Sequence, residues 1–364
     1  MMGLFVSHSS NVLIDRNVFT DIGINTSYKE GKPLININSY LAYHGILHLG
    51  PDHENITITN NYIDGVGITR YWETNAVFNS GGSAVLIANN EVTRSSGGAM
   101  HVISNKHGKH DGIEDWVINV EYNYIHDFGA GITNDFGGIK TGSQAFCDDL
   151  SEQEMEEVCF AYIRVYNNMV TNGKSYYCCA NLLYSDVSAS KNLFENNILY
   201  GSADTAIIHH CGIENESKNN IVHRNIEPEN GEKPISDLWG ACEANKDKHQ
   251  AFNNHLNIYY FENTEDFHLY RPYNFFDERS VFTDNLYWSL VPEDETKGLF
   301  PPDDLSFGEL PSEDRNQWAD PEFSGPEFHN YLLAEGSPAL AMGIQQIRLD
   351  NFGIPGDRKP FYLS

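Results

Sequence analysis

The sequence predicts an all-β protein wound as a parallel β-helix, and three observations predict it. One short pattern recurs along the 364 residues, at intervals of 28 to 45 residues. Each recurrence alternates β-branched with polar residues and then reaches an Asn and a Gly-containing turn. A segment of this length holds about three short strands, which is one coil of a parallel β-helix.

The recurring Asn marks one position in each coil, as in "NVLIDRNVFTDIG", "NITITNNYIDGVG" and "WVINVEYNYIHDFG". We expect the repeat at Asn17, Asn61, Asn90, Asn123, Asn168, Asn197 and Asn225. Asn suits a bend where the backbone is left-handed and where side-chain amides stack from coil to coil, which predicts a structural role. The 44-residue interval after Asn17 predicts a second, hidden coil containing "INSYLAYHGILHLG".

The two ends of the chain depart from the repeat. The pattern predicts a β-helix over residues 1–290 and, because Pro, Asp and Glu dominate afterwards, an extended tail over 291–364 that packs on it. The first coil begins almost at Met1, although terminal coils normally need a cap. We therefore expect an N-terminally truncated chain, or a missing segment or another chain that covers that end.

Charge and cysteine content limit which binding partners and metals are expected. With 51 acidic and 23 basic side chains the chain repels nucleic acid and anionic membranes, which favours a neutral oligo- or polysaccharide. The start shows no signal peptide, while three glycosylation sequons favour an extracellular or lumenal full-length protein. The six cysteines lack zinc-finger spacing, so no structural zinc is predicted, and the predicted hydrolysis requires no metal and no cofactor. A disulfide between Cys147 and Cys159 and six reduced thiols both remain open.

Aligning four strands by their apolar residues predicts where polar groups gather. "GAMHVIS", "GGIKTG", "LLYSDVS" and "AIIHHCG" place Met100, Ile139, Leu183 and Ile207 inward together. Two outward columns then hold Gly142, Asp186 and His210, and beside them His101, Lys140 and Tyr184. Such a face suits a shallow groove for a linear glycan.

Two carboxylates on that face would suffice for glycoside hydrolysis, one as general acid and one as nucleophile or base. We predict Asp135, in the turn before "GGIKTG", and Asp186 as this catalytic pair, about 5 Å apart in a retaining enzyme and further apart in an inverting one. The predicted substrate-binding residues are His210, Glu214, Lys140, Tyr184 and His101.

The strings "HDFGAGITNDFGGIKTG", "LLYSDVSAS" and "HHCGIENESKNNIVHRN", followed by "DNLYW", "DPEF" and "SPALAMG", resemble right-handed parallel β-helix proteins of glycoside hydrolase family 141. The resemblance implies a right-handed helix, hydrolysis of α-fucosidic or xylosidic bonds in complex plant glycans, and Asp135 and Asp186 as the matching acids. His210 and Glu214 also match. Val187, Lys140 and Ile208 depart from the family pattern, which has Glu, Tyr and His there.

Two other functions remain open from the sequence. A non-catalytic glycan-binding or structural β-helix is favoured by Val187, Ile208 and the absent N-terminal cap. A calcium-dependent lyase or epimerase acting on uronates would use Lys140 as its base, although the acidic net charge weighs against that substrate.

Overall fold

The structure is a computed structural model of the chain. It describes residues 4–22, 28–29, 32–33, 47–49, 53–67, 75–104, 117–129, 136–143, 151, 153, 160–174, 180–186, 189–201, 205–210, 212–224, 235–240, 250–262, 267–270, 280–290 and 315–356.

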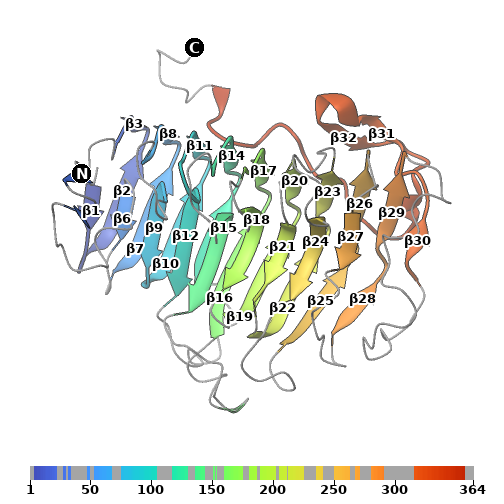
Figure 1. Cartoon of the computed structure of the whole chain (residues 1–364), viewed down its shortest axis with the longest axis horizontal. Coiled ribbons are helices and arrows are strands. Elements are labelled where there is room, and N and C mark those ends of the chain that lie inside the picture. The colour runs from blue at the N-terminus through green and yellow to red at the C-terminus, as the bar shows by residue number, and fades with distance from the viewer. Residues whose placement is uncertain are drawn as a thin grey trace.

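The predicted parallel β-helix is confirmed. Three long parallel sheets run side by side along the molecule, and neighbouring strands within each sheet come from successive coils (Figure 1). Sheet A contains β1 (Leu4–Val6), β6 (Leu47–Leu49), β9 (Val77–Ser80), β12 (Met100–Ser104), β15 (Phe136–Ser143), β18 (Ala180–Asp186), β21 (Thr205–His209), β24 (Ile235–Gly240) and β27 (Phe267–Tyr270).

Sheets B and C complete the coils. Sheet B contains β2 (Ser10–Asp15), β7 (Glu54–Thr59), β10 (Ser83–Ala88), β13 (Ile118–Glu121), β16 (Phe160–Tyr166), β19 (Ser190–Glu195), β22 (Gly212–Lys218), β25 (Gln250–His255) and β28 (Val281–Thr283). Sheet C contains β3 (Val18–Thr20), β8 (Tyr62–Asp64), β11 (Glu91–Thr93), β14 (Tyr124–His126), β17 (Met169–Thr171), β20 (Ile198–Tyr200), β23 (Ile221–Arg224), β26 (Ile258–Phe261), β29 (Leu286–Ser289) and β30 (Gln317–Trp318).

The core lies between the three sheets and is filled by alternate residues of each strand. The predicted inward column of sheet A is confirmed, because Met100, Ile139, Leu183 and Ile207 pair in register and are all fully buried. Sheets B and C add Ile, Val and Phe side chains from the same coils to this continuous core. Alternation with a period of two is what directs every second side chain inward.

A ladder of asparagines joins the coils at the corner between sheets B and C. Each side chain accepts from the preceding ladder Asn and, in most coils, donates to the next, as in Asn90 Nδ2 to Asn123 Oδ1 at 3.0 Å. The ladder runs through Asn17, Asn61, Asn90, Asn123, Asn168, Asn197, Asn220, Asn257, Asn285 and Asn316. The predicted seventh position, Asn225, is wrong: Asn220 occupies it, 23 residues after Asn197.

The left-handed residue of this corner stands one position before the ladder Asn. Asn60, Asn89, Asn167 and Asn219 have φ between 53° and 56°, and the chain then turns into sheet C. Asn tolerates this conformation better than most residues, which explains the repeated Asn-Asn pairs of the sequence.

The hidden coil expected after Asn17 is absent from the described strands. Val12 of β2 pairs directly with Ile56 of β7, and Val18 of β3 pairs directly with Tyr62 of β8. These 44 residues therefore form one coil. The additional length includes a small antiparallel pair, β4 (Tyr28–Lys29) with β5 (Lys32–Pro33).

The C-terminal residues first extend the solenoid and then run back along it. β30 pairs with β29, so the helix continues beyond the predicted boundary at residue 290. Residues 319–356, here called the strap, contain β31 (Phe323–Gly325), η3 (Pro326–Phe328), β32 (Asn330–Leu333) and α2 (Pro338–Ala341). In Figure 1 the strap passes over the short strands of sheet C from β29 towards β14.

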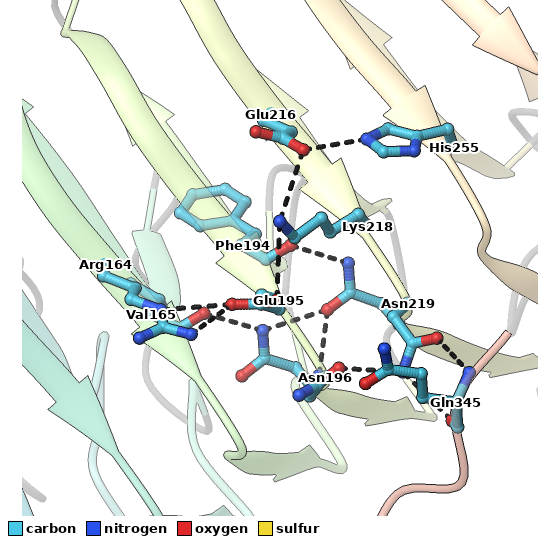
Figure 2. A network of polar contacts seen from close by, with 12 residues as sticks. Arg164, Val165, Phe194, Glu195, Asn196, Glu216, Lys218, Asn219, His255 and Gln345 are labelled. Atoms are coloured by element: carbon cyan, nitrogen blue, oxygen red, sulfur yellow. Dashed lines mark hydrogen bonds and ion pairs between the residues drawn. The ribbon is translucent and has the colours of Figure 1, made fainter. Parts of the chain in front are cut away.

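Apolar contacts and corner asparagines hold the strap. A second core joins one outward column of sheet C to the strap; its members are Ile198, Ile221, Ile258 and Leu286 with Tyr331, Ala339, Ile344 and Ile347. Asn219 donates to the Gln345 carbonyl at 3.0 Å and accepts from its N–H at 2.6 Å (Figure 2). Further back, Asn89 Nδ2 donates to the carbonyls of Asn351 and Gly353.

Within the described residues, no helix has the length and apolar character needed to cross a bilayer. Cys147 and Cys159, like the other four cysteines, lie outside the described residues.

Candidate functional site

The predicted outward columns of sheet A are brought together as expected. His101 of β12 pairs with Lys140 of β15, and Lys140 pairs with Tyr184 of β18. Gly142 pairs with Asp186 at the end of the same two strands. His210 follows β21, and its N–H donates to the Ser185 carbonyl at 2.7 Å, which brings it beside Asp186.

Asp186 is the centre of a cluster of polar side chains. Its Oδ2 lies 2.8 Å from Lys140 Nζ. Its Oδ1 accepts from Tyr184 Oη at 2.9 Å and lies 2.8 Å from His210 Nδ1. Lys140 Nζ also stands 4.6 Å from the centre of the Tyr184 ring, a cation–π distance. We call Lys140, Tyr184, Asp186 and His210 the Asp186 cluster.

The cluster keeps Asp186 ionised. Burial alone would raise the pKa of its carboxyl, but the hydrogen bond from His210 and the charge of Lys140 outweigh burial and hold that pKa well below its ordinary range. A group that stays ionised in this way can accept protons in hydrogen bonds and stabilise a cation. It cannot act as the general acid near neutral pH.

The cluster is more deeply buried than residues of an open shallow groove would be. The side chains of Lys140 and Asp186 are only 7% and 10% exposed. Phe78 and Ile208, which also point outward from sheet A, are buried too. His210, at 39% exposed, is the member of the cluster through which solvent or a ligand has access.

His101 borders the cluster across a glycine. A Cβ at Gly142 would lie 3.7 Å from His101 Nε2 and 4.0 Å from the Asp186 carbonyl, both ordinary contact distances. The His101 ring also packs edge-on against Phe78, with 5.2 Å between ring centres. His101 is thus placed beside the strand end that carries Asp186.

One predicted site residue is not joined to the cluster, and another lies outside the described residues. Glu214 lies on β22 of sheet B, where its carboxylate is 2.7 Å from Lys191 Nζ. Asp135 lies outside the described residues, but its neighbour Phe136 pairs with Ala180, six residues before Asp186.

The contact between Asp186 and His210 has a recognisable chemical meaning. A carboxylate at Nδ1 fixes the imidazole orientation and its tautomer, so that proton exchange takes place at Nε2. It also stabilises the imidazolium that forms when Nε2 accepts a proton, as in catalytic Asp–His pairs. The His210 ring is therefore suited to general acid–base chemistry.

Comparison of the chain with protein-family models, with curated proteins and with solved structures finds no match. Sequence reasoning selected every member of the Asp186 cluster, because the register followed from the apolar residues. It missed a second polar cluster around His223, Glu262 and Tyr331. No local pattern in the sequence marks these residues, and Tyr331 reaches His223 only when the strap folds back.

Proposed function

We propose that the chain hydrolyses a glycosidic bond in a neutral glycan and that the Asp186 cluster is its catalytic centre. The observation that carries this proposal is the ionised Asp186 bound to Nδ1 of the partly exposed His210. A solenoid face of parallel strands gives a linear sugar chain one set of contacts per coil. The strongly negative net charge of −28 favours an uncharged substrate.

In the proposed reaction His210 Nε2 takes a proton from water while the water oxygen bonds to the anomeric carbon. Asp186 stabilises the resulting imidazolium. The glycosidic bond breaks towards the leaving oxygen, which takes a proton from an acid. Asp135, the other member of the predicted pair, is proposed as that acid. Lys140 and Tyr184 fix the Asp186 carboxylate through the contacts described above.

The resemblance to glycoside hydrolase family 141 supports hydrolysis of a glycosidic bond and suggests α-fucosidic or xylosidic bonds, with Asp135 and Asp186 as the matching acids. Among the described residues it depends on "GGIKTG", on the strand that ends at Asp186, and on His210. The Asp186 cluster includes Lys140, one of the residues that depart from the family pattern, so the sugar recognised here need not be that of the family.

A glycan panel tests the proposal. Wild type should release reducing ends from at least one neutral oligosaccharide carrying fucose or xylose. Asp186→Asn and His210→Gln should each lower kcat by a factor of about 10² or more, because general base catalysis contributes 10²–10⁴. Glu54→Gln, which neutralises an exposed acid of sheet B, is the matched control and should retain activity.

Asp135→Asn separates the two acids. Loss of activity only with a poor leaving group would support Asp135 as the proton donor, whereas full activity would remove it from the mechanism. Turnover that survives in both Asp186→Asn and His210→Gln would contradict the proposal.

The burial of Asp186 favours one rival, a non-catalytic structural or glycan-binding β-helix. An ion pair in which both side chains are about nine-tenths covered also occurs as a purely structural device. Glycan binding without turnover across the panel would favour this rival. The lyase finds less support, because Lys140 sits against an ionised carboxylate that stabilises its ammonium form, and a base must be neutral.

A further inference from the structure

A second polar cluster lies between sheet C and the strap. His223 of β23 places Nδ1 2.8 Å from Tyr331 Oη of β32, and Nε2 2.9 Å from Glu262 Oε1, just after β26. His223 and Tyr331 are almost completely buried, at 1% and 0% exposure. One imidazole thus connects the solenoid to the strap.

The other groups around His223 come from both sides of this contact. Sheet C supplies the rings of Tyr200 and Tyr260, each centred 4.9 Å from the imidazole. The strap supplies His329, whose Nδ1 lies 3.3 Å from Tyr331 Oη and whose ring packs on Tyr200. The negative charges of two strap acids, Asp320 and Glu327, help to raise the pKa of Tyr260, and that of Glu327 also helps to raise the pKa of Glu262.

We propose that His223 is a pH-sensitive latch that holds the strap on sheet C when neutral and favours its release when the medium becomes acidic. This inference is independent of the proposed catalytic function. It concerns a different sheet and a segment that sequence analysis treated only as a tail.

The two contacts of His223 require a neutral ring. With Glu262 ionised, Nε2–H donates to the carboxylate and Nδ1 accepts from the Tyr331 hydroxyl. A second proton would occupy Nδ1 and remove that acceptor. Burial, together with the charge of His329, lowers the pKa of His223 to about 3.

Release of the strap would expose His223 and return its pKa to about 6.5. Between pH 6.5 and 3 the released state therefore binds a proton that the docked state does not. Each pH unit in this window shifts the docking equilibrium about tenfold towards release. Burial also lowers the pKa of His329, which acts in the same direction. Burial raises the pKa of Glu262, so proton uptake there opposes release.

Hydrogen exchange on the full chain tests the latch. After correction for intrinsic rates, the protection of the Asn330–Leu333 amides should fall about tenfold per pH unit from pH 6.5 to 4. The amides of Ser83–Ala88, inside sheet B, report the solenoid. They should remain more strongly protected than the strap amides at every pH in this range, although buried His209 lowers their protection as well.

Three variants sharpen the test. His223→Gln retains hydrogen-bonding capacity but cannot titrate, so most of the pH dependence should disappear. His255→Gln, a histidine paired with Glu216 on sheet B, should behave as wild type. Glu262→Gln removes the opposing proton uptake and should steepen the dependence, which provides a result even if His223→Gln does not fold. A flat profile in wild type, or an unchanged slope in His223→Gln, would overturn the latch.

Discussion

Lys140 Nζ lies 2.8 Å from Asp186 Oδ2, and both of these charged side chains are buried on sheet A. They come from adjacent coils, 46 positions apart in the sequence, and the strand register alone brings them together. The pair is therefore the centre of the candidate site. Substituting it measures how much the site contributes to the stability of the fold.

Removing one member of this pair should destabilise the protein. Asp186→Asn leaves the Lys140 ammonium buried without its counter-charge, which costs about 3–5 kcal/mol in comparable buried pairs. Lys140→Met/Asp186→Leu removes both charges and should cost less than Asp186→Asn alone. Urea unfolding measures both variants, and a double variant that is less stable than the single one would contradict this account.

The asparagine ladder should contribute more at its centre than at its end. Asn123→Ala removes the acceptor for Asn90 and the donor to Asn168 and to the Ile87 carbonyl, all of them buried. Each group left unsatisfied costs about 1–3 kcal/mol. Asn17→Ala, at the exposed first position, should lose far less. Denaturant midpoints of the two variants check this difference.

Acid should weaken the fold through His209. Burial lowers the pKa of His209 to about 3, whereas an unfolded histidine titrates near 6.5. As pH falls from 6.5 towards 3 the unfolded chain gains a proton that the folded chain does not. This proton removes about 1.4 kcal/mol of unfolding free energy per pH unit. Above pH 6.5 the effect is absent. Urea titrations at several pH values should show a shallower slope for His209→Gln than for wild type.

Two glycines of β15 should differ in how much stability they lose on substitution by alanine. A Cβ at Gly138 would approach Val170 Cγ1 to 2.4 Å, so Gly138→Ala forces the core to shift and should cost about 1–3 kcal/mol. A Cβ at Gly142 meets only ordinary contacts, so Gly142→Ala should fold with near wild-type stability. Thermal unfolding of the pair provides the comparison. Equal losses would show that the backbone, and not the packing, determines both.

The fold could be predicted because short stretches of sequence show both the alternation within each strand and the Asn that recurs in each coil. Alternation with a period of two identified the inward residues Met100 and Ile139, and the recurring Asn identified the corner. The same reasoning could not separate Asn220 from Asn225, because both stand near a strand in "KNNIVHRN". Coil length carries no fixed value, so the 44 residues after Asn17 were wrongly divided into two coils.

The strand register that brings the candidate site residues together could be predicted for the same reason. Asp186, Lys140 and Tyr184 lie on strands whose register follows from their apolar residues. Their burial did not follow from the register. The contact between His223 and Tyr331 spans 108 residues and forms only through the path of the strap, for which the sequence offers no periodic signal.

Successive asparagines of the ladder are separated by as few as 23 and as many as 45 residues. The hydrogen bonds between their side-chain amides nevertheless keep the same length to within a few tenths of an ångström. The spacing between successive coils is thus independent of the number of residues in each coil. Such a scaffold tolerates gain or loss of sequence between rungs. It offers sites where a foreign loop can be grafted without propagating strain to the neighbouring turns.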